Sequence, residues 1–599
     1  MRAILMALLM SSVVLAGCAT DDSEPAPEPA PPVRVDPGPG FEVTEVDLLG
    51  NPVPKLLCFE LAAFPTKATA EQEADGTRCN FEMTPDEGRT GNEVTIAVNP
   101  TDPRNVVGGA KDYYPADAGD CVWNGVYVTH DGGRTVYQDR SFDGSPWHLY
   151  NGDVGGFTPN YASTFWCTTD PVAYFNTAGT LYYLLMAYQT DPVTGSKACE
   201  EICPNGALND WAFNRATQIV AVSDDGGDTF HTFTPVLEGT FPVNFADKGW
   251  IAASADGTIH VMWWSAFLPG NMYFRSTDGG QTYSDPEILS VFLGPGAGGA
   301  DLPDPAPSVG TGPAGQGSFV DVGTGAEVYA IWASSGVQML RSFDHGSTWD
   351  EQRTIIDTNP RSMPTIDGRD RRGGHPQLAT DRNPDSPFAD ALYVAWQDGC
   401  QATEWFDGCA GSDLNESLTG TGIWVASSFD KGETWNAPVR VSDAPEGADE
   451  WRIFPTVSVS PGGVVDVSWM DSRDTRWLPC AGANAPHGEP DCGDEYQALH
   501  QRYSYSLDGG KTWSTDFQVR DATDDGWDPA DCHHQNGDIF IGDYNDIDSS
   551  WQAAHPVWPD TRDGHCDVYT ATIQRPMFAE GWTDEARAGA EQFILEHPL

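Results

Sequence analysis

A short motif that occurs six times constrains the fold of this chain more than any other feature. In most copies it reads Ser/Thr-x-Asp-x-Gly-x-Thr-aromatic. The copies occupy residues 129–135, 223–230, 276–283, 342–349, 428–435 and 506–513. Each copy has the chemistry of a hairpin turn, because the Asp side chain can accept hydrogen bonds from N–H groups of its own loop and the Gly adopts a positive φ. The closing aromatic residue can pack between neighbouring sheets.

Pairs of short runs rich in β-branched and aromatic residues precede the copies. Examples are residues 93–98 with 105–109, and 455–459 with 464–469. Short strands at even spacing with a periodic aromatic motif are typical of a β-propeller. One further module, at residues 540–573, lacks the motif. We therefore predict an all-β propeller, with seven blades favoured over six, and expect residues 41–48 to supply the last outer strand.

The repeated motif resembles the Asp-box, or BNR repeat, of sialidases and their propeller relatives, and we call its six copies Asp-boxes. The resemblance covers most of the body of the chain. It implies that the Asp-boxes lie on the propeller rim, away from a catalytic centre. Their acidic residues are therefore expected to be structural: Asp131, Asp225, Asp278, Asp344, Asp430 and Asp508.

The N-terminal region has the features of an export signal. Residues 1–17 contain a short apolar run that ends in Leu-Ala-Gly before Cys18, which resembles the lipobox of bacterial lipoproteins and implies lipidation of Cys18. An ordinary secretory signal is the alternative. Residues 18–40 form a Pro-rich linker. We expect the propeller over 41–577, a helix packed on it over 578–599, and a lipid-anchored location at the cell envelope, with the outer membrane favoured.

Charge and cysteine content limit the partners. The formal net charge of −56 argues against nucleic-acid binding. Of the 13 cysteines, those other than Cys18 fall into couples close in sequence: Cys58/Cys79, Cys121/Cys167, Cys199/Cys203, Cys400/Cys409, Cys480/Cys492 and Cys532/Cys566. Export makes disulfides the expected state of these couples. No cofactor or catalytic metal is required by the residues, although the Asp-rich stretches 524–528 and 543–548 could hold a structural calcium ion.

Charged residues at the module openings are the candidates for chemistry. The residues at module openings are Glu93, Asp170, Lys248, His375, Arg452 and Asp543–Tyr544. A second repeat, Trp-x-Asp-Ser/Thr-Arg-Asp, occurs at 469–474 and 558–563. It either places Asp/Arg pairs around a shared pocket or forms a structural salt bridge in each turn.

The resemblance to sialidases implies specific roles. Active members clamp a carboxylate with three arginines, use a Tyr nucleophile activated by Glu, and use an Asp as acid/base. By placement, Arg452, Arg473 and Arg562 would form the clamp, with His375 also binding substrate. Tyr544 with Glu93 or Asp543 would be the nucleophile pair, and Asp471 or Asp560 would transfer protons.

The chain departs from the sialidase pattern in its first module. The Arg-Ile-Pro motif of sialidases is missing there, and 452–455 reads Arg-Ile-Phe-Pro in a late module. The prediction is thus a sialidase-like glycoside hydrolase acting on acidic glycans, with lyase chemistry on uronates as a variant. A non-catalytic glycan- or protein-binding propeller and an envelope scaffold are the alternatives.

Overall fold

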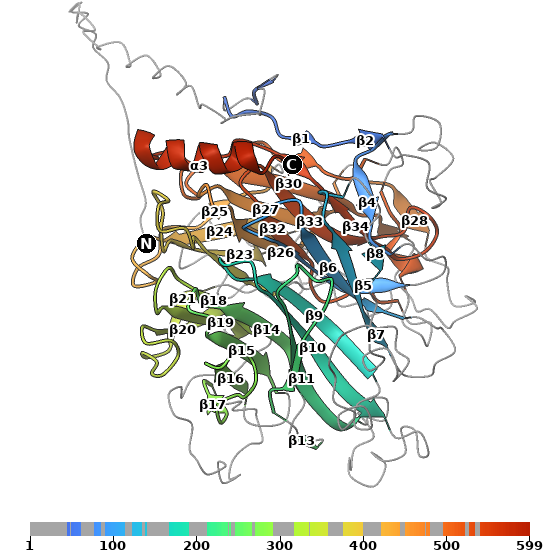
Figure 1. Cartoon of the computed structure of the whole chain (residues 1–599). Coiled ribbons are helices and arrows are strands. Elements are labelled where there is room, and N and C mark those ends of the chain that lie inside the picture. Colours follow the sequence, from blue (N-terminus) through green and yellow to red (C-terminus); the bar gives the residue numbers. More distant parts are fainter. Residues whose placement is uncertain are drawn as a thin grey trace, which may run out of the picture. The chain divides into compact units, whose positions relative to one another are not determined.

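Seven antiparallel sheets form the body of the chain, as the computed structural model shows (Figure 1), and five of them have four strands, one has five and one has six. The structure describes residues 43, 45–47, 50–60, 77–84, 90–113, 122–133, 138–139, 167–190, 213–237, 239–240, 246–265, 270–290, 317–334, 336–357, 375–398, 421–443, 450–473, 475–479, 495–521, 526–532 and 539–599. The first strands of consecutive sheets contact one another in a closed series that returns from the last sheet to the first. The chain is therefore a seven-blade propeller, and the predicted fold class and the favoured blade count are confirmed.

The blades follow the chain in order, and each is given from its inner strand outward. Blade 1 contains β5 (Gly91–Val98), β6 (Val106–Asp112), β7 (Trp123–Thr129) and β8 (Gln138–Asp139). Blade 2 contains β9 (Cys167–Phe175), β10 (Leu181–Thr190), β11 (Phe213–Ser223) and β12 (Thr232–Pro235), with β13 (Gly239–Thr240) also on β11. Blade 3 contains β14 (Asp247–Ala253), β15 (Ile259–Trp264), β16 (Asn271–Ser276) and β17 (Glu287–Ile288). Blade 4 contains β18 (Phe319–Val322), β19 (Val328–Ser334), β20 (Gly336–Ser342) and β21 (Arg353–Ile356).

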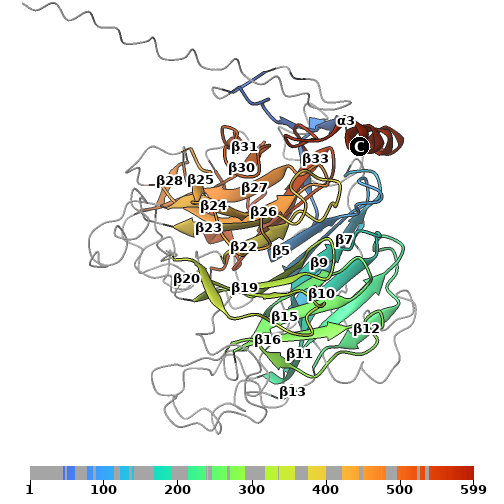
Figure 2. The same ribbon diagram turned by 90° about the vertical axis from the view of Figure 1, so that its left-hand side faces the viewer.

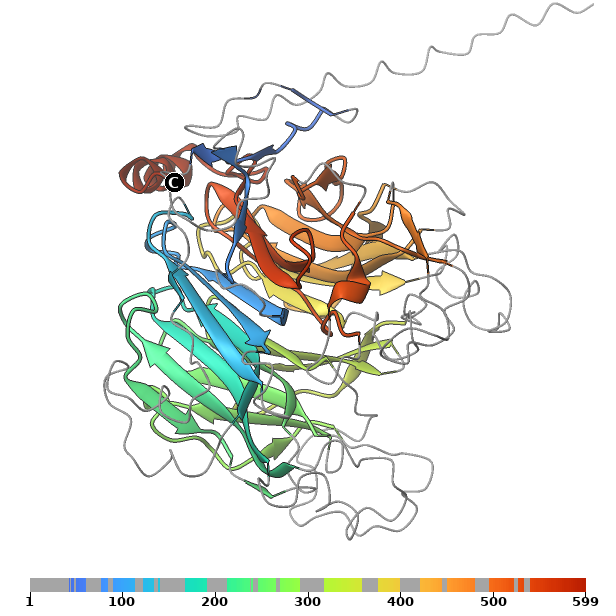
Figure 3. The ribbon, with the colours of Figure 1, turned by 90° about the vertical axis from the view of Figure 1, so that its right-hand side faces the viewer.

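The remaining blades complete the ring (Figures 2 and 3). Blade 5 contains β22 (Gln377–Thr380), β23 (Leu392–Asp398), β24 (Gly422–Ser428) and β25 (Val439–Arg440). Blade 6 contains β26 (Arg452–Val459), β27 (Val465–Asp471), β30 (His500–Ser506) and β31 (Phe517–Gln518). Blade 7 contains β32 (Asp546–Ser549), β33 (Ala553–Asp560), β34 (Asp567–Ala571) and, from the N-terminal part of the chain, β4 (Asn80–Glu82).

Short elements lie outside the four-stranded pattern. β1 (Lys55–Leu56) pairs with β35 (Ile573–Gln574), which extends the sheet of blade 7. Two hairpins pair β2 (Phe59–Glu60) with β3 (Thr77–Arg78), and β28 (Trp477–Pro479) with β29 (Glu495–Gln497). A 3₁₀ turn, η2, spans Pro529–Asp531, and helix α3 spans Asp584–Glu596. No helix in the described part of the chain is long and apolar enough to cross a membrane.

The ring is closed by a different segment from the one expected. Residues 41–48 were predicted to supply the outer strand of blade 7, and this prediction is wrong. β4 pairs with β34 instead, with Phe81 opposite Thr570. The buried Phe81 and Met83 pack between blades 7 and 1, so the closing strand is the one whose apolar residues fill that gap.

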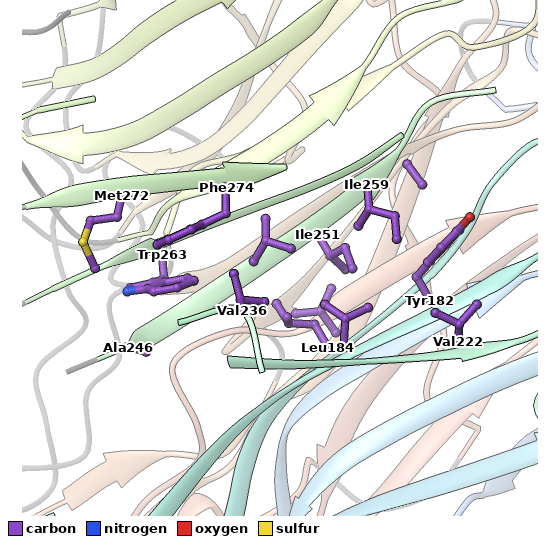
Figure 4. Packing of buried hydrophobic residues seen from close by; sticks show 14 residues of the cluster. Tyr182, Leu184, Val222, Val236, Ala246, Ile251, Ile259, Trp263, Met272 and Phe274 are labelled. Carbon is purple, nitrogen blue, oxygen red and sulfur yellow. The ribbon is translucent and has the colours of Figure 1, made fainter. Parts of the chain in front are cut away.

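The hydrophobic core lies between the blades. Between blades 2 and 3, Leu184 and Val220 pack against Ile251 and Trp263, and the Trp263 ring stacks on Phe274 at 4.2 Å (Figure 4). Similar clusters draw side chains from each of the pairs 1/2, 3/4, 4/5, 5/6 and 7/1. Both faces of blades 1 to 5 are thus covered by apolar clusters, which explains why their strands are nearly continuous apolar runs in the sequence.

The Asp-boxes form the turns between the third and fourth strands, as their chemistry predicts. In blade 3 the Ser276 hydroxyl donates to Asp278 at 2.8 Å and accepts from the Gly280 N–H at 2.9 Å. Asp278 also accepts from the N–H and the hydroxyl of Thr282, at 2.9 and 2.6 Å. The same bonds recur in the boxes of blades 2, 4, 5 and 6. These carboxylates are occupied within their own turns.

Two of the predicted disulfides lie in the described residues. They join Cys58 to Cys79 and Cys532 to Cys566. The other four couples lie wholly or partly outside the described residues, as do Cys18 and the export signal.

Helix α3 begins as the sequence indicates. The Thr583 side chain accepts a hydrogen bond from the Ala586 N–H at its N-terminus. Its buried Ala590 and Ile594 pack with Met577 and Phe578.

Aspartates of blade 7 join its inner strand to that of blade 1. Asp546 accepts hydrogen bonds from the N–H of Ile96 and the hydroxyl of Thr95, at 3.1 and 2.9 Å. Asp548 accepts from the N–H of Val98 at 2.7 Å. Without these carboxylates, the N–H groups along this edge of β5 would be unpaired inside the protein.

Asp546 should make stability depend on pH. Burial raises its pKa to about 7 despite the hydrogen bonds from Ile96 and Thr95. A folded-state pKa above the unfolded one means that the folded protein holds the extra proton, so the stabilisation is full at low pH and is lost as pH rises towards 7. We expect the unfolding free energy to fall by up to about 4 kcal/mol over this range, and by clearly less in Asp546→Asn. Chemical denaturation at several pH values measures how the unfolding free energy changes with pH in the parent, in Asp546→Asn and in the exposed control Asp285→Asn. Equal slopes in all three proteins would contradict the assignment of this pH dependence to Asp546.

Candidate functional site

The long connections of the propeller all leave from one end. Strand directions alternate within each blade, so the turns from second to third strand share an end with the links to the next blade. These include residues 191–212, 291–316, 358–374 and 399–420. At the other end the first and second strands are joined by short turns such as 254–258 and 323–327. Binding and catalytic residues are concentrated on loops that a rigid scaffold positions, so the long-connection end is the functional candidate.

The inner strands of blades 1, 2 and 3 are distorted where they begin at this end. Glu93, Asp170 and Lys248 have left-handed φ values of 49°, 53° and 51°, and the strand register shifts at each position. Phe454 occupies the same place in blade 6, with a φ of 52°. A left-handed conformation costs a residue with a side chain about 1–3 kcal/mol and is often found at functional sites. In three consecutive blades the strained residue is charged.

These charged side chains converge on Lys248. Its Nζ lies 2.6 Å from Glu93 Oε1, 3.2 Å from Asp170 Oδ2 and 2.9 Å from Asp543 Oδ2. Asp247 Oδ1 is 3.6 Å away. Lys111 Nζ, from β6, lies 3.0 Å from the other oxygen of Glu93. We call these six residues the Lys248 cluster, and every member is buried.

The cluster separates the pKa values of two carboxyl groups. Burial would raise the pKa of Glu93, but the ammonium groups of Lys111 and Lys248 outweigh it and lower that pKa to about 2. Burial and the charge of Glu93 raise the pKa of Asp170, against the opposing effect of Lys248, and Asp170 shares a hydrogen bond with Glu93. The pKa values of these two neighbouring carboxyl groups are therefore shifted in opposite directions. Such a division is typical of acid/base sites.

Tyr544 lies near the cluster but lacks the expected activation. Its hydroxyl donates to the Pro171 carbonyl at 3.4 Å, and its ring is 6.2 Å from that of Trp250. Burial, followed by the charges of Asp170 and Glu93, raises the pKa of Tyr544 well above its usual value. Nearby carboxylates disfavour the phenolate, so the geometry does not support the predicted Tyr544–Glu93 nucleophile pair.

The first Trp-x-Asp-Ser-Arg-Asp copy forms a closed ion-pair network in blade 6. Asp471 Oδ2 lies 3.2 Å from Arg452 and 3.0 Å from Arg473, and it accepts from the Trp469 indole N–H at 3.0 Å. Arg473 also contacts Asp516 at 2.5 Å. Arg452, 1 % exposed, contacts Glu450 at 2.5 Å as well. The positive charges of both arginines are therefore already balanced by carboxylates of the protein.

The second copy repeats this arrangement in blade 7. Asp560 lies 2.7 Å from Arg562 and 2.8 Å from Arg520, and it accepts from the Trp558 indole N–H at 3.1 Å. Arg562 also contacts Asp521 at 2.8 Å. Because Arg520 and Asp521 follow the outer strand of blade 6, the network joins two blades. The structural salt-bridge interpretation fits this repeat, and the clamp of Arg452, Arg473 and Arg562 with proton transfer by Asp471 or Asp560 does not.

His375 lies outside the Lys248 cluster. It precedes β22 and packs against Gly317, in the segment before β18. Of the predicted site residues, the structure thus gathers Glu93 at the cluster and places Tyr544 close to it. Lys111 and Asp247 were missed. The signal for Lys111 was a lysine within the apolar strand 106–112, a position where lysine is rarely buried without a partner.

A polar cavity lies in the channel towards the short-turn end. Among its lining residues are Tyr174, Asp321, Arg382, Ser458 and Asp548. Arg382, from blade 5, donates to the Tyr174 hydroxyl of blade 2 at 2.6 Å and to the Phe175 carbonyl at 3.2 Å. This contact links two blades across the channel and was not predicted from the sequence.

The expected calcium finds no support in the described residues. Within them, no group of three or more His, Cys, Asp or Glu is arranged to hold a metal ion. In the stretch 543–548, Asp546 and Asp548 bind backbone N–H groups instead. Part of the stretch 524–528 lies outside the described residues.

Comparisons with known proteins give structural likeness without sequence relationship. No family model matches the chain, and no curated protein matches it. A Dyadobacter fermentans protein of unknown function has a TM-score of 0.38 at 11% identity, covering 65% of this chain and 93% of its own. A Hadza microbial sialidase has a TM-score of 0.36 at 12% identity, covering 63% of each chain. The GH93 α-L-arabinofuranosidase of Fusarium graminearum has a TM-score of 0.35 at 10% identity, covering 83% of this chain and 98% of its own. Likeness at these values carries no conclusion about activity.

If the second repeat is structural, removing its acid should destabilise the fold. Asp560→Asn would leave Arg520 and Arg562 buried without their shared counter-charge, and we expect a loss of about 3–5 kcal/mol of unfolding free energy. Chemical denaturation measures this loss, with Asp285→Asn as the exposed control. A change of less than about 1 kcal/mol would show that the pair does not hold the blades together.

Proposed function

We propose that this protein is a glycoside hydrolase whose active site is the Lys248 cluster at the long-connection end. The observation that carries the proposal is the hydrogen-bonded pair of Glu93 and Asp170, in which one pKa is lowered and the other raised. Hydrolysis of a glycosidic bond needs one protonated and one ionised carboxyl group at the same site. The strained backbone at Glu93, Asp170 and Lys248 supports a functional role for these positions.

The contacts assign a role to each group. Asp170 would donate its proton to the oxygen of the scissile bond, and Glu93 would keep that proton on Asp170 until substrate is in place. Asp543, held by Lys248 at 2.9 Å, would supply the ionised carboxylate. Lys248 would orient both acids, and Tyr544 would support the site as a neutral phenol.

The spacing favours a retaining reaction. Asp170 and Asp543 each place an oxygen on the same Lys248 nitrogen, at 3.2 and 2.9 Å. Two such oxygens are too close together for the separation of about 6.5–9.5 Å that inverting enzymes use. In the first step the Asp543 carboxylate would attack the anomeric carbon while the leaving oxygen takes the Asp170 proton. Water would then cleave the glycosyl ester, returning a proton to Asp170.

One observation favours a second function. Arg452, Arg473 and Arg562 are all bound by carboxylates, so the arginine clamp of a sialidase is not assembled. A non-catalytic propeller that binds glycan or protein at the same end is therefore the alternative.

We also propose that the protein is exported and anchored at the cell envelope through a lipid on Cys18. The lipobox-like sequence before Cys18 supports this proposal, and so do the disulfides Cys58–Cys79 and Cys532–Cys566, because disulfides persist in oxidising compartments.

Asp170→Asn should remove the proton donor without removing the fold. We expect kcat on a glycan substrate to fall by about 10²–10⁴-fold, with unfolding close to that of the parent. In the parent, the rate should fall as pH rises through the raised pKa of Asp170, because only the protonated form donates. The pH–rate profiles of parent, Asp170→Asn and the control Asp285→Asn test this expectation. Full activity in a folded Asp170→Asn variant would exclude Asp170 as the acid, and binding without turnover in the parent would favour the alternative function.

A further inference from the structure

The proposed active site carries more negative than positive charge. Four carboxyl groups surround two ammonium groups in the Lys248 cluster. Even with Asp170 protonated, the three remaining carboxylates exceed Lys111 and Lys248. A ligand entering this site therefore meets an excess of carboxylate.

Neither lysine of the cluster is available to an anionic ligand. Lys248 has four carboxyl groups within 3.6 Å. Lys111 contacts Glu93 at 3.0 Å, and its Nζ lies 5.0 Å from the centre of the Phe540 ring. An acidic sugar would have to compete with contacts that are already made in a buried environment, where separating an ion pair is costly.

Three arginines described at this end are committed as well. Arg452 contacts Glu450 and Asp471, Arg473 contacts Asp471 and Asp516, and Arg562 contacts Asp521 and Asp560. A carboxylate-bearing sugar is normally held by the bidentate fork of an arginine. These three forks are already occupied by carboxylates of the protein.

The net charge of the whole chain also disfavours the binding of acidic ligands. A formal net charge of −56 repels polyanions before they reach the surface and attracts cationic ligands, most strongly at low ionic strength.

We infer that the substrate is a glycan without acidic groups, either neutral or carrying protonated amino groups. This inference rests on the proposed function and names its substrate class. It replaces the acidic glycan expected from the sialidase resemblance, because the basic groups described at this site are already paired with carboxylates of the protein.

Pairs of related glycans, one with and one without acidic groups, test this inference. Suitable pairs are polygalacturonate with its fully methyl-esterified form, glucuronoxylan with unsubstituted xylan, and sialyllactose with lactose, with linear arabinan and chitosan oligosaccharides added. Turnover and binding would be measured with the full chain at low and high salt. We expect turnover only on glycans without acidic groups. We also expect acidic members to bind at least about tenfold more weakly at low salt, with the difference shrinking as salt screens the repulsion.

A variant tests whether the Lys248 cluster causes the discrimination between acidic and non-acidic glycans. Asp247→Asn removes one negative charge beside Lys248 and should narrow the difference between the members of a pair, whereas the distant Asp285→Asn should not. Equal or faster turnover of the acidic members would overturn the inference and leave the proposed hydrolase intact. No turnover of any glycan would overturn the proposed function and the inference with it.

Discussion

The structure depends on packing apolar side chains between neighbouring blades, which the described residues do in six of the seven pairs. The apolar clusters lie between sheets rather than within them, so no blade has a core of its own and the ring must close. Closure uses three kinds of contact. β4 adds the outer strand of blade 7, the carboxylates of Asp546 and Asp548 pair with the edge of β5, and Arg520 of blade 6 pairs with Asp560 of blade 7.

A rigid ring allows strained and charged residues to be held at its centre. Left-handed backbone at Glu93, Asp170 and Lys248 is costly for an isolated strand, but each strand is fixed on both sides by neighbouring blades. The distortion turns one charged side chain from each of three blades towards the same point. Burial then makes the Coulomb interactions between them strong enough to shift the pKa values of two acids in opposite directions.

The fold could be predicted from sequence because its signals are local. An Asp-box acts within one turn, and Ser276, Asp278 and Thr282 form the same bonds as their equivalents in the other boxes. The closing strand was mistaken because β4 has only three residues and depends on contacts with β34 at the far end of the chain. The repeat containing Asp471 and Asp560 could not be assigned a catalytic or a structural role from its own sequence. The role depends on ion pairs with Arg520 and Asp516, which lie outside the motif.

The candidate site was predictable only in outline. Charged residues at successive module openings suggested convergence, and Glu93, Asp170, Lys248 and Asp543 do converge. Their pairing joins residues 155 and 78 positions apart, and the left-handed conformation of Glu93, Asp170 and Lys248 has no signature in residue type. The opposite effects on the pKa values of Glu93 and Asp170 follow from burial and from which lysine faces which oxygen, and these are properties of the assembled ring.

Burial and the neighbouring ionised Glu93 raise the pKa of Asp170, and the proposed chemistry depends on this shift. Infrared difference spectroscopy tests this claim most directly, by comparing the parent protein with Asp170→Asn and with Glu93→Gln. A protonated carboxyl band should be present in the parent and absent from Asp170→Asn. It should also disappear in Glu93→Gln, where Lys248 would favour the ionised form of Asp170. A parent spectrum without this band, or a band that Glu93→Gln leaves unchanged, would contradict the account.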